Sequence, residues 1–253
     1  MSAITSMISA PKSEIIPTVA DFAPYARTVW RLVEAQHRIS TNRLAASAED
    51  QALLERLVEQ VKPTMPAAAR GLHFLLATPF RYGYAKPSRF RRAGQRPGIF
   101  YAAETIATAI AETAYWRLLF FSRSPGFVPS STVVEHSAFT VPLKVTRTLD
   151  LTTPRFAQDA AIWMHPLDYG PCQTFADHAR RLDTQAIRYA SVRDPDHRAN
   201  LALLDPTGFA NALPNIEQTW HFRYEAGLMT AFAAFPSDER YTFALTDFGL
   251  AAG

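Results

Sequence analysis

One segment, residues 80–117, constrains this chain more than any other, because it joins a cationic loop, a short strand and a helix. Its first half carries six basic residues and no acidic one: Arg81, Lys86, Arg89, Arg91, Arg92 and Arg96. Its second half predicts a strand over residues 98–102 and a helix from about Thr105. Glu112 lies inside that helix among mostly apolar neighbours, where a charge is costly to bury without a partner or a purpose. The segment predicts a site for an anionic ligand whose reacting centre becomes cationic.

Two arginines of the loop are the first candidates for ligand binding. A guanidinium presents a planar fork that matches phosphate oxygens, so Arg81 and Arg89 could bracket a pyrophosphate. The alternative is a solvated basic loop. Arg81 lies between aromatic residues, so among the basic residues of the loop it is the one least expected to be exposed without a function. Arg91, Arg92 and Arg96 are expected at the surface.

Three further residues each have two interpretations. Tyr101 ends the predicted strand, where its ring could stack on a flat heterocycle or pack in the core beside Phe100. Glu112 is either a functional carboxylate or a helix-surface acid, although no cation stands three or four residues from it. Ser191 precedes an Asp-Pro turn, and a serine there is usually a turn residue.

The remaining pattern predicts an α+β fold with a mixed or antiparallel sheet. Helices are expected over residues 22–37, 47–61 and 171–182, and residues 71–77 are ambiguous between strand and helix. Strands are expected at residues 132–151 (broken by Pro142), 186–190, 201–204, 219–224 and 241–245, and a loop at 122–131. The first two helices form an N-terminal layer that packs on the rest or on a second copy. Residues 1–20 are expected to be partly disordered.

Composition and motif searches exclude several classes of function. The single cysteine, Cys172, excludes an internal disulfide and a Cys/His zinc site, and the seven histidines show no HExxH spacing, so no metal is expected. The net charge of +3 is too small to imply nucleic-acid binding. No signal peptide or membrane-spanning run is evident, which predicts a cytoplasmic protein that does not bind membranes. The motifs of Rossmann domains, P-loop proteins and α/β-hydrolases are missing from the sequence.

Several motifs together resemble a known family. They are TPFRY (78–82), SRFRRAG (88–94), GIFYAAE (98–104) and TAIAETAYWR (108–117), with WRLVEAQHRISTNRL (30–44) upstream. In type, order and spacing they resemble the RES-domain proteins, which are the toxins of RES–Xre toxin–antitoxin pairs. The similarity runs from about residue 28 to the C-terminus.

The resemblance implies an ADP-ribosyltransferase-like core over residues 71–253, preceded by a disordered start and a helical extension in residues 1–70. This core would bind NAD⁺ as substrate and break its nicotinamide–ribose bond by hydrolysis or phosphorolysis, without a prosthetic group. By motif, Arg81 and Arg89 match the family arginines near the NAD⁺ phosphates. Tyr101 matches the nicotinamide-pocket tyrosine, and Glu112 matches the acidic residue. Ser191 is our choice for the serine, because Gly170 stands where some members have one.

The chemistry agrees with a single carboxylate. Nicotinamide leaves as a neutral molecule, so one glutamate can steady the oxocarbenium-like ribose without a general acid. Inorganic phosphate is a candidate co-substrate. The resemblance also implies an Xre-type helix-turn-helix antitoxin, or another cognate immunity protein, as partner, with no direct binding of nucleic acid. The apolar faces of the N-terminal helices suggest a homodimer.

Two other functions remain open at this point. The first is transfer of ADP-ribose to a protein, which is disfavoured for arginine targets because Ile110 stands where a second acidic residue would be needed. The second is a non-catalytic nucleotide- or nucleic-acid-binding module that uses the basic loop.

Overall fold

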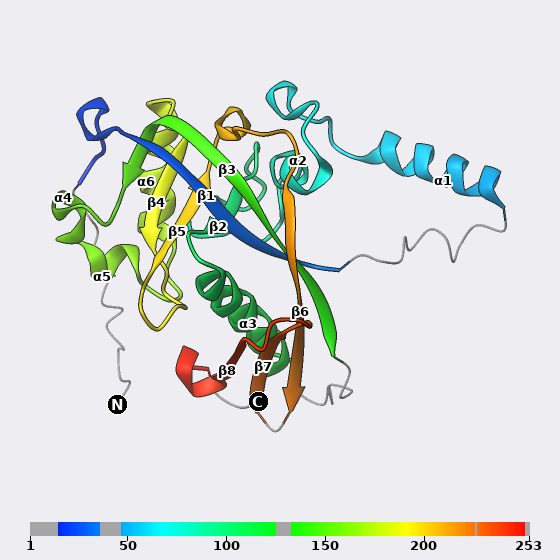
Figure 1. Cartoon of the computed structure of the whole chain (residues 1–253). Helices are drawn as coiled ribbons and strands as arrows, with labels where there is room; N and C mark the ends of the chain where they lie inside the picture. The colour runs from blue at the N-terminus through cyan, green and yellow to red at the C-terminus, as the bar shows by residue number, and fades with distance from the viewer. Residues whose placement is uncertain (1–14, 36–46, 125–132, 226, 251–253) are drawn as a thin grey trace, which may run out of the picture.

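The computed structural model describes residues 15–35, 47–124, 133–225 and 227–250. One mixed sheet dominates the fold (Figure 1). Its strands are β1 (Ala23–Glu34), β2 (Phe100–Ala103), β3 (Val134–Asp150), β4 (Ala186–Ala190), β5 (Ala199–Leu203), β6 (Asn215–Glu225), β7 (Leu228–Ala233) and β8 (Arg240–Ala244). The helices are α1 (Ala48–Val61), α2 (Phe74–Arg81), α3 (Ile106–Ser122), α4 (Pro154–Ala157), α5 (Ala160–Trp163) and α6 (Gly170–Arg181), with 3-10 turns η1 (Val19–Asp21), η3 (Ala67–Ala69), η4 (Pro206–Gly208) and η5 (Leu245–Phe248).

Part of the sheet closes into a barrel. The strand order is β1-β2-β5-β4-β3-β6-β7-β8, and an additional pairing of β1 with β3 closes the first five strands on themselves. Strands β3 and β4 pair in parallel, and the other pairs are antiparallel. The α+β class and the mixed sheet are therefore confirmed.

The helix expected over residues 22–37 is wrong, because this segment forms β1. Its apolar run contains valines and a tryptophan, which favour strands as much as helices. The long antiparallel pairing with β3 favours the strand over the helix. Its register runs without a break from Tyr25 opposite Val145 to Glu34 opposite His136. The helical layer is thus reduced to α1, which extends away from the body of the molecule (Figure 1). The boundary proposed near residue 70 does not separate the strands, because β1 belongs to the same sheet as the rest.

The break expected at Pro142 is also wrong, because β3 continues through it. Between Thr140, which pairs with β6, and Thr148, which pairs with β4, the only strand paired with β3 is β1. Proline cannot donate a backbone hydrogen bond, so it is tolerated where one side of a strand has no partner strand.

Local signals placed the other elements well. Ser47 caps α1 by accepting from the backbone of Asp50, and Thr105 caps α3 in the same way from Thr108. The ambiguous segment after residue 71 gives α2, residues 171–182 give α6 within one residue, and β4 has the expected bounds. Strand β7 was not expected. Residues 1–14 of the expected disordered start, residues 125–131 of the expected loop and residue 132 of the expected strand lie outside the described residues.

Three apolar clusters hold these elements together. One fills the barrel around Phe80, Phe100 and Phe139. A second packs α6 on the sheet, and a third packs α3 against β6, β7 and β8 (Figure 1). Each fully buried phenylalanine stabilises the fold by roughly 1.5–3 kcal/mol. The last two clusters fix α3 and α6 on the sheet; α3 carries part of the candidate site, and Tyr169, which precedes α6, lines it as well.

Candidate functional site

A cavity of about 240 Å³ lies where β1, β2, α3 and the β4–β5 connection meet. Its walls combine aromatic rings with a few charged groups. The lining residues are Trp30, Arg31, Leu32, Ser88, Arg89, Tyr101, Ala102, Ala103, Ala109, Glu112, Thr113, Trp116, Tyr169, Tyr189, Val192, Arg193 and Asn200. Among these residues Glu112 is the only one with a carboxylate, against three arginines.

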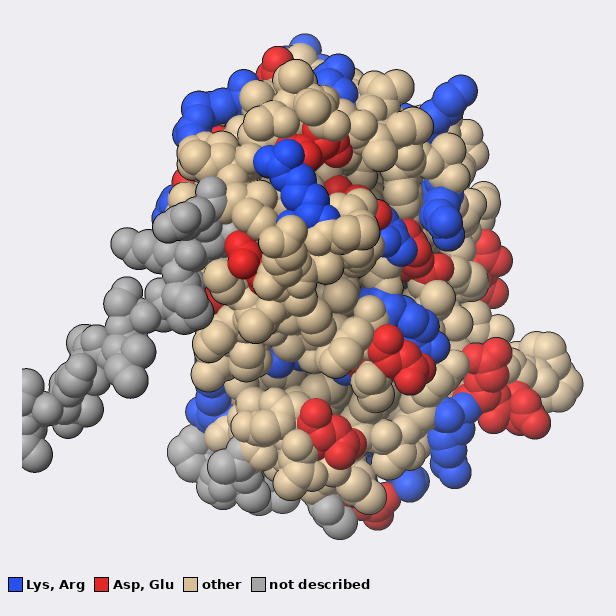
Figure 2. All heavy atoms as spheres, turned by 90° about the vertical axis from the view of Figure 1, so that its left-hand side faces the viewer, with Lys and Arg blue, Asp and Glu red and all other residues tan. Residues whose placement is uncertain are grey.

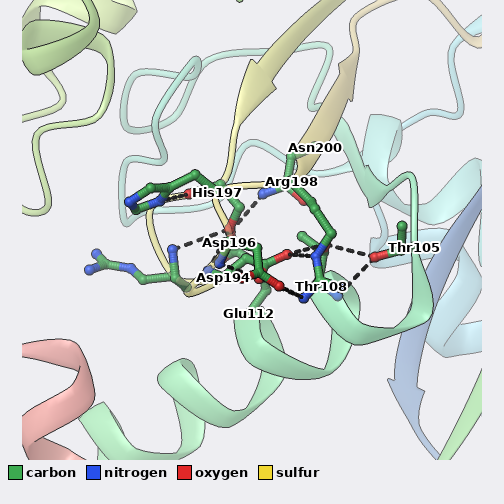
Figure 3. Close-up of polar contacts among 10 residues, drawn as sticks. Thr105, Thr108, Glu112, Asp194, Asp196, His197, Arg198 and Asn200 are labelled. Carbon is green, nitrogen blue, oxygen red and sulfur yellow. Dashed lines mark hydrogen bonds and ion pairs between the residues drawn. The ribbon is translucent and has the colours of Figure 1, made fainter.

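Glu112 is oriented by two hydrogen bonds to the same oxygen. The Ser191 hydroxyl donates to Glu112 Oε1 over 2.7 Å, and the Asn200 amide donates to it over 2.6 Å. Figure 3 shows the Glu112 side chain leaving α3 toward the β4–β5 connection. Within the described part of the chain, both of these bonds go to Oε1, so Oε2 remains to face a ligand.

The three arginines of the cavity keep unused hydrogen-bond donors. Arg89 donates from Nη1 to the carbonyls of Trp163 (2.6 Å) and His165 (3.1 Å), and its guanidinium lies 4.8 Å from the Tyr169 ring centroid. Arg193 donates from Nη2 to the Pro166 carbonyl over 2.6 Å. Both arginines are buried. In the described residues neither forms an ion pair with a carboxylate.

Arg31 is the least satisfied of the three. Its Nη1 is buried without a hydrogen-bond partner among the described residues, and its guanidinium stands 4.8 Å from the Phe100 ring centroid. Burial lowers the pKa of Arg31 to about 10, against an opposing effect of Tyr84. The side chain is therefore still charged at neutral pH. A cation with a buried, unpartnered nitrogen and no counterion among the described residues favours binding of an anion.

Tyr101 is held by its hydroxyl, not by its ring alone. That oxygen bonds with Ser88 Oγ over 2.9 Å and accepts from the backbone of Phe90 over 3.1 Å. Burial raises the pKa of Tyr101, so the phenol stays protonated at neutral pH. These bonds fix the ring on the cavity wall, beside the loop that carries Arg89.

The structure brings four of the five predicted site residues together. Glu112, Arg89 and Tyr101 line the cavity, and Ser191 contacts Glu112. It does not bring Arg81 there. Arg81 donates from Nε to the Pro63 carbonyl over 2.6 Å and pairs with Glu59 of α1 over 2.6 Å. Its role at the site stays a prediction that this geometry does not support.

Arg91 is not the surface residue that the sequence suggested. It is 5% exposed and donates to three backbone carbonyls, those of Tyr84, Lys86 and Arg92. Unlike the cavity arginines, Arg91 uses both terminal nitrogens in these bonds. It closes the basic loop on itself, so its charge is satisfied without a ligand.

Three functional candidates were missed from the sequence: Arg31, Arg193 and Asn200. Arg31 was missed because residues 22–37 were expected to form a helix. In the structure Arg31 lies on β1, which pairs with β2. A signal existed for Arg193, which follows Ser191 by two residues in the same polar turn. Asn200 lay just outside the strand expected at 201–204.

The described residues contain neither a cluster of metal ligands nor a membrane-spanning helix. No group of three or more His, Cys, Asp or Glu side chains in the described ranges is arranged to hold a metal ion. No described helix is both long enough and apolar enough to span a bilayer. Cys172 is fully buried, and burial raises the pKa of its thiol.

Comparison with known proteins shows the family to which this chain belongs. The model of the RES domain matches residues 65–225, which is more than half of the chain. The protein therefore belongs to the RES-domain family. The chain is also similar to the crystal structure of the M. tuberculosis MbcT-MbcA toxin-antitoxin complex, with 14% identity and a TM-score of 0.44 over 80% of this chain and 87% of that one. The comparison with curated proteins gave no match.

Proposed function

We propose that the protein is an NAD⁺-degrading toxin that cleaves the nicotinamide–ribose bond, and that a cognate antitoxin neutralises it. The observation that carries the proposal is the charge of the cavity, where three arginines with unused donors surround one carboxylate. Such an excess of buried positive charge suits a ligand with two phosphates. The aromatic walls suit flat heterocycles.

Glu112 would act on the ribose. When the bond between C1′ and the pyridinium nitrogen breaks, its electron pair goes to nitrogen and nicotinamide leaves neutral. The sugar becomes an oxocarbenium-like cation, which a carboxylate at hydrogen-bond range stabilises. Ser191 and Asn200 hold Oε1, so Oε2 would face the sugar. An oxygen of water or phosphate then forms the new bond to C1′, and water releases its proton to solvent.

Arg31, Arg89 and Arg193 would hold the pyrophosphate and, in phosphorolysis, the incoming phosphate. Tyr101 would line the nicotinamide end, as the family resemblance implies. The ADP-ribosyltransferase-like core, the Xre-type antitoxin, a homodimeric state and a cytoplasmic location belong to the same proposal, supported by membership of the RES-domain family.

Two alternatives are weaker. Arginine-directed transferases need an acid two residues before the catalytic glutamate, but Ile110 is fully buried in the core at that position. A nucleic-acid-binding module needs a continuous basic surface. On the face that Figure 2 presents, Lys and Arg are interspersed with Asp and Glu.

The test is incubation of the purified protein with NAD⁺, with and without inorganic phosphate, and identification of the products by mass spectrometry. We expect nicotinamide in both cases, with ADP-ribose from hydrolysis or its 1″-phosphate from phosphorolysis. Glu112→Gln should lower turnover by about 10²–10³-fold, in line with loss of one transition-state contact. Glu104→Gln is the matched control. Intact NAD⁺ with the wild-type protein, or equal turnover in Glu112→Gln, would refute the proposal.

A further inference from the structure

The β4–β5 connection, residues 191–198, is built around a fully buried carboxylate, that of Asp194. It accepts a short hydrogen bond from the Thr108 hydroxyl, and two from Arg198, from Nε over 2.7 Å and from Nη2 over 2.8 Å. The backbone of Asp196 donates to it as well, over 3.1 Å. Figure 3 shows these contacts joining the connection to α3. The carboxylate is thus saturated by this protein's own groups.

The same connection sets the direction of the Ser191 hydroxyl. Ser191 Oγ accepts the backbone N–H groups of Arg193 and Asp194, each over 3.1 Å. With both acceptor positions occupied, its proton is directed to Glu112 Oε1, 2.7 Å away. Thr108 stands one helical turn before Glu112 on α3. The Asp194–Thr108 bond therefore ties the turn that carries Ser191 to the helix that carries Glu112.

We propose that Asp194 is a positioning residue, which acts through Ser191 to aim Glu112 Oε2 into the cavity. The inference rests on the proposed function. Arg198, which does not line the cavity, neutralises the charge of Asp194. The Asp194 carboxylate can therefore hold the β4–β5 connection in place without reducing the positive charge of the cavity arginines. Burial alone would raise the pKa of Asp194, but the bonds from Arg198 and Thr108 bring it below the usual range. The carboxylate is ionised at neutral pH.

The first test compares two aspartates of one connection. Asp194→Asn keeps the shape of the side chain and removes its charge. Asp196→Asn changes an exposed residue whose carboxylate pairs with Arg198 alone among the described residues. We expect Asp194→Asn to lower kcat for NAD⁺ about 10–100-fold, since small displacements of a reacting group have effects of this size. KM should change less than about 3-fold, because the arginines remain. Asp196→Asn should stay within about 2-fold of wild type. Unchanged kcat in Asp194→Asn would overturn the proposal.

A double-mutant cycle separates positioning from general stabilisation. If Asp194 acts through Ser191, then Asp194→Asn in the Ser191→Ala background should lower kcat by less than about 3-fold further. A residue that only stabilises the fold would cost the same factor in both backgrounds, so additive effects on kcat would contradict the inference. If Asp194→Asn does not fold, Thr108→Val replaces it in the cycle, because it removes only the hydroxyl.

A ligand-free measurement keeps this inference distinct from the proposed function. Amide hydrogen exchange of Arg193 and Asp194 reports the two bonds to Ser191 Oγ. Asp194→Asn or Thr108→Val should speed exchange at both amides by about 10-fold or more, and Asp196→Asn should not. Unchanged protection would overturn the role of Asp194 even in an active enzyme. A wild-type protein that leaves NAD⁺ intact would instead refute the proposed function. Amide exchange of Arg193 and Asp194 could still be measured in that protein.

Discussion

Two charged clusters on neighbouring strands of the same barrel differ in whether their charges are matched. In the first, Glu104 takes two bonds from Arg188, of 2.7 and 3.1 Å, and a third from the Tyr25 hydroxyl. Arg188 also pairs with Asp150 over 3.1 Å, and Arg27 approaches Glu104 to 3.9 Å. Acids and bases alternate, so this cluster is complete without a ligand.

The second cluster is the cavity, where Arg31, Arg89 and Arg193 face the single acid Glu112. The two clusters are close in sequence as well. Arg188 and Tyr189 are adjacent on β4, and strand alternation sends one to the matched cluster and the other to the cavity wall. We therefore use the absence of a matching charge among the described residues, and not basicity alone, to choose the arginines proposed to bind the ligand.

The largest expected effect is on the matched cluster. Arg188→Met leaves Glu104 and Asp150 without their main partner, and we expect a loss of about 3 kcal/mol in the free energy of unfolding. Turnover of NAD⁺ per folded molecule should be unchanged. Urea unfolding checks the stability. Arg92→Met, which breaks an exposed ion pair with Asp177, is the control and should cost about 1 kcal/mol or less. A large fall in turnover would show that the clusters are not separate.

A change in the cavity should have the opposite signature. Arg89→Met removes a charge that we propose binds the substrate, and we expect KM for NAD⁺ to rise about 30–100-fold, since a charge-assisted bond contributes about 1.5–3 kcal/mol. The free energy of unfolding should change by about 1 kcal/mol or less, because relief of the unmatched charge offsets two lost bonds to carbonyls. Steady-state kinetics and urea unfolding measure the two quantities.

The control for this variant is Arg91→Met, in an equally buried arginine outside the cavity lining. It should lower stability, because three carbonyls lose their donor, and leave KM unchanged. If Arg91→Met raises KM as much as Arg89→Met does, the basic loop as a whole, not the cavity, attracts the ligand.

A smaller effect is expected from pH on the cavity. Since the pKa of Arg31 is lowered to about 10, its charge is lost as pH rises through that value, before an unperturbed arginine would titrate. Affinity for ADP-ribose should fall about 10-fold between pH 8.5 and 11, by calorimetry. Arg31→Met should bind more weakly at pH 8.5 and lack this fall. If the affinity for ADP-ribose falls equally in the wild type and in Arg31→Met, a titrating group other than Arg31 is responsible.

The smallest effect is expected from acid on the matched cluster. Burial alone would raise the pKa of Glu104, but the bonds from Arg188 and Tyr25 and the charge of Arg27 hold it below its usual value. A depressed folded-state pKa adds stability that is present above the unfolded value, 4.5, and is lost as pH falls through the folded one. The stability gap between wild type and Glu104→Gln should therefore narrow by on the order of 1 kcal/mol from pH 5.5 to 3. Thermal unfolding across this range tests it, and a constant gap would contradict it.

Local signals in the sequence were enough for much of the fold. Capping residues such as Ser47 and Thr105 mark helix starts, and the lone acid Glu112 marked the centre of the site because its surroundings are apolar. Strand β1 could not be predicted this way. Its partner β3 lies about a hundred residues away, and only that long pairing overrides a helical pattern of apolar residues.

The same limit explains why Arg31, and not Arg81, lines the cavity. Arg81 looked functional because its sequence neighbours are aromatic, but its actual partner, Glu59, belongs to another helix. Arg31 looked ordinary within a predicted helix, and becomes a cavity residue only when β1 closes the barrel. Charge matching between distant segments is a property of tertiary structure, so a local pattern cannot reveal which arginine is left unmatched.

Strand β1 has one more consequence. It lies wholly ahead of residues 65–225, the part that the RES model matches, yet it supplies both the strand that closes the barrel and Arg31, a cavity cation with a buried nitrogen that has no partner among the described residues. The same strand therefore completes the sheet and places the positive charge of Arg31 at the cavity. A polypeptide that starts after β1 would lack both the β1–β3 pairing and the charge of Arg31 at the cavity wall.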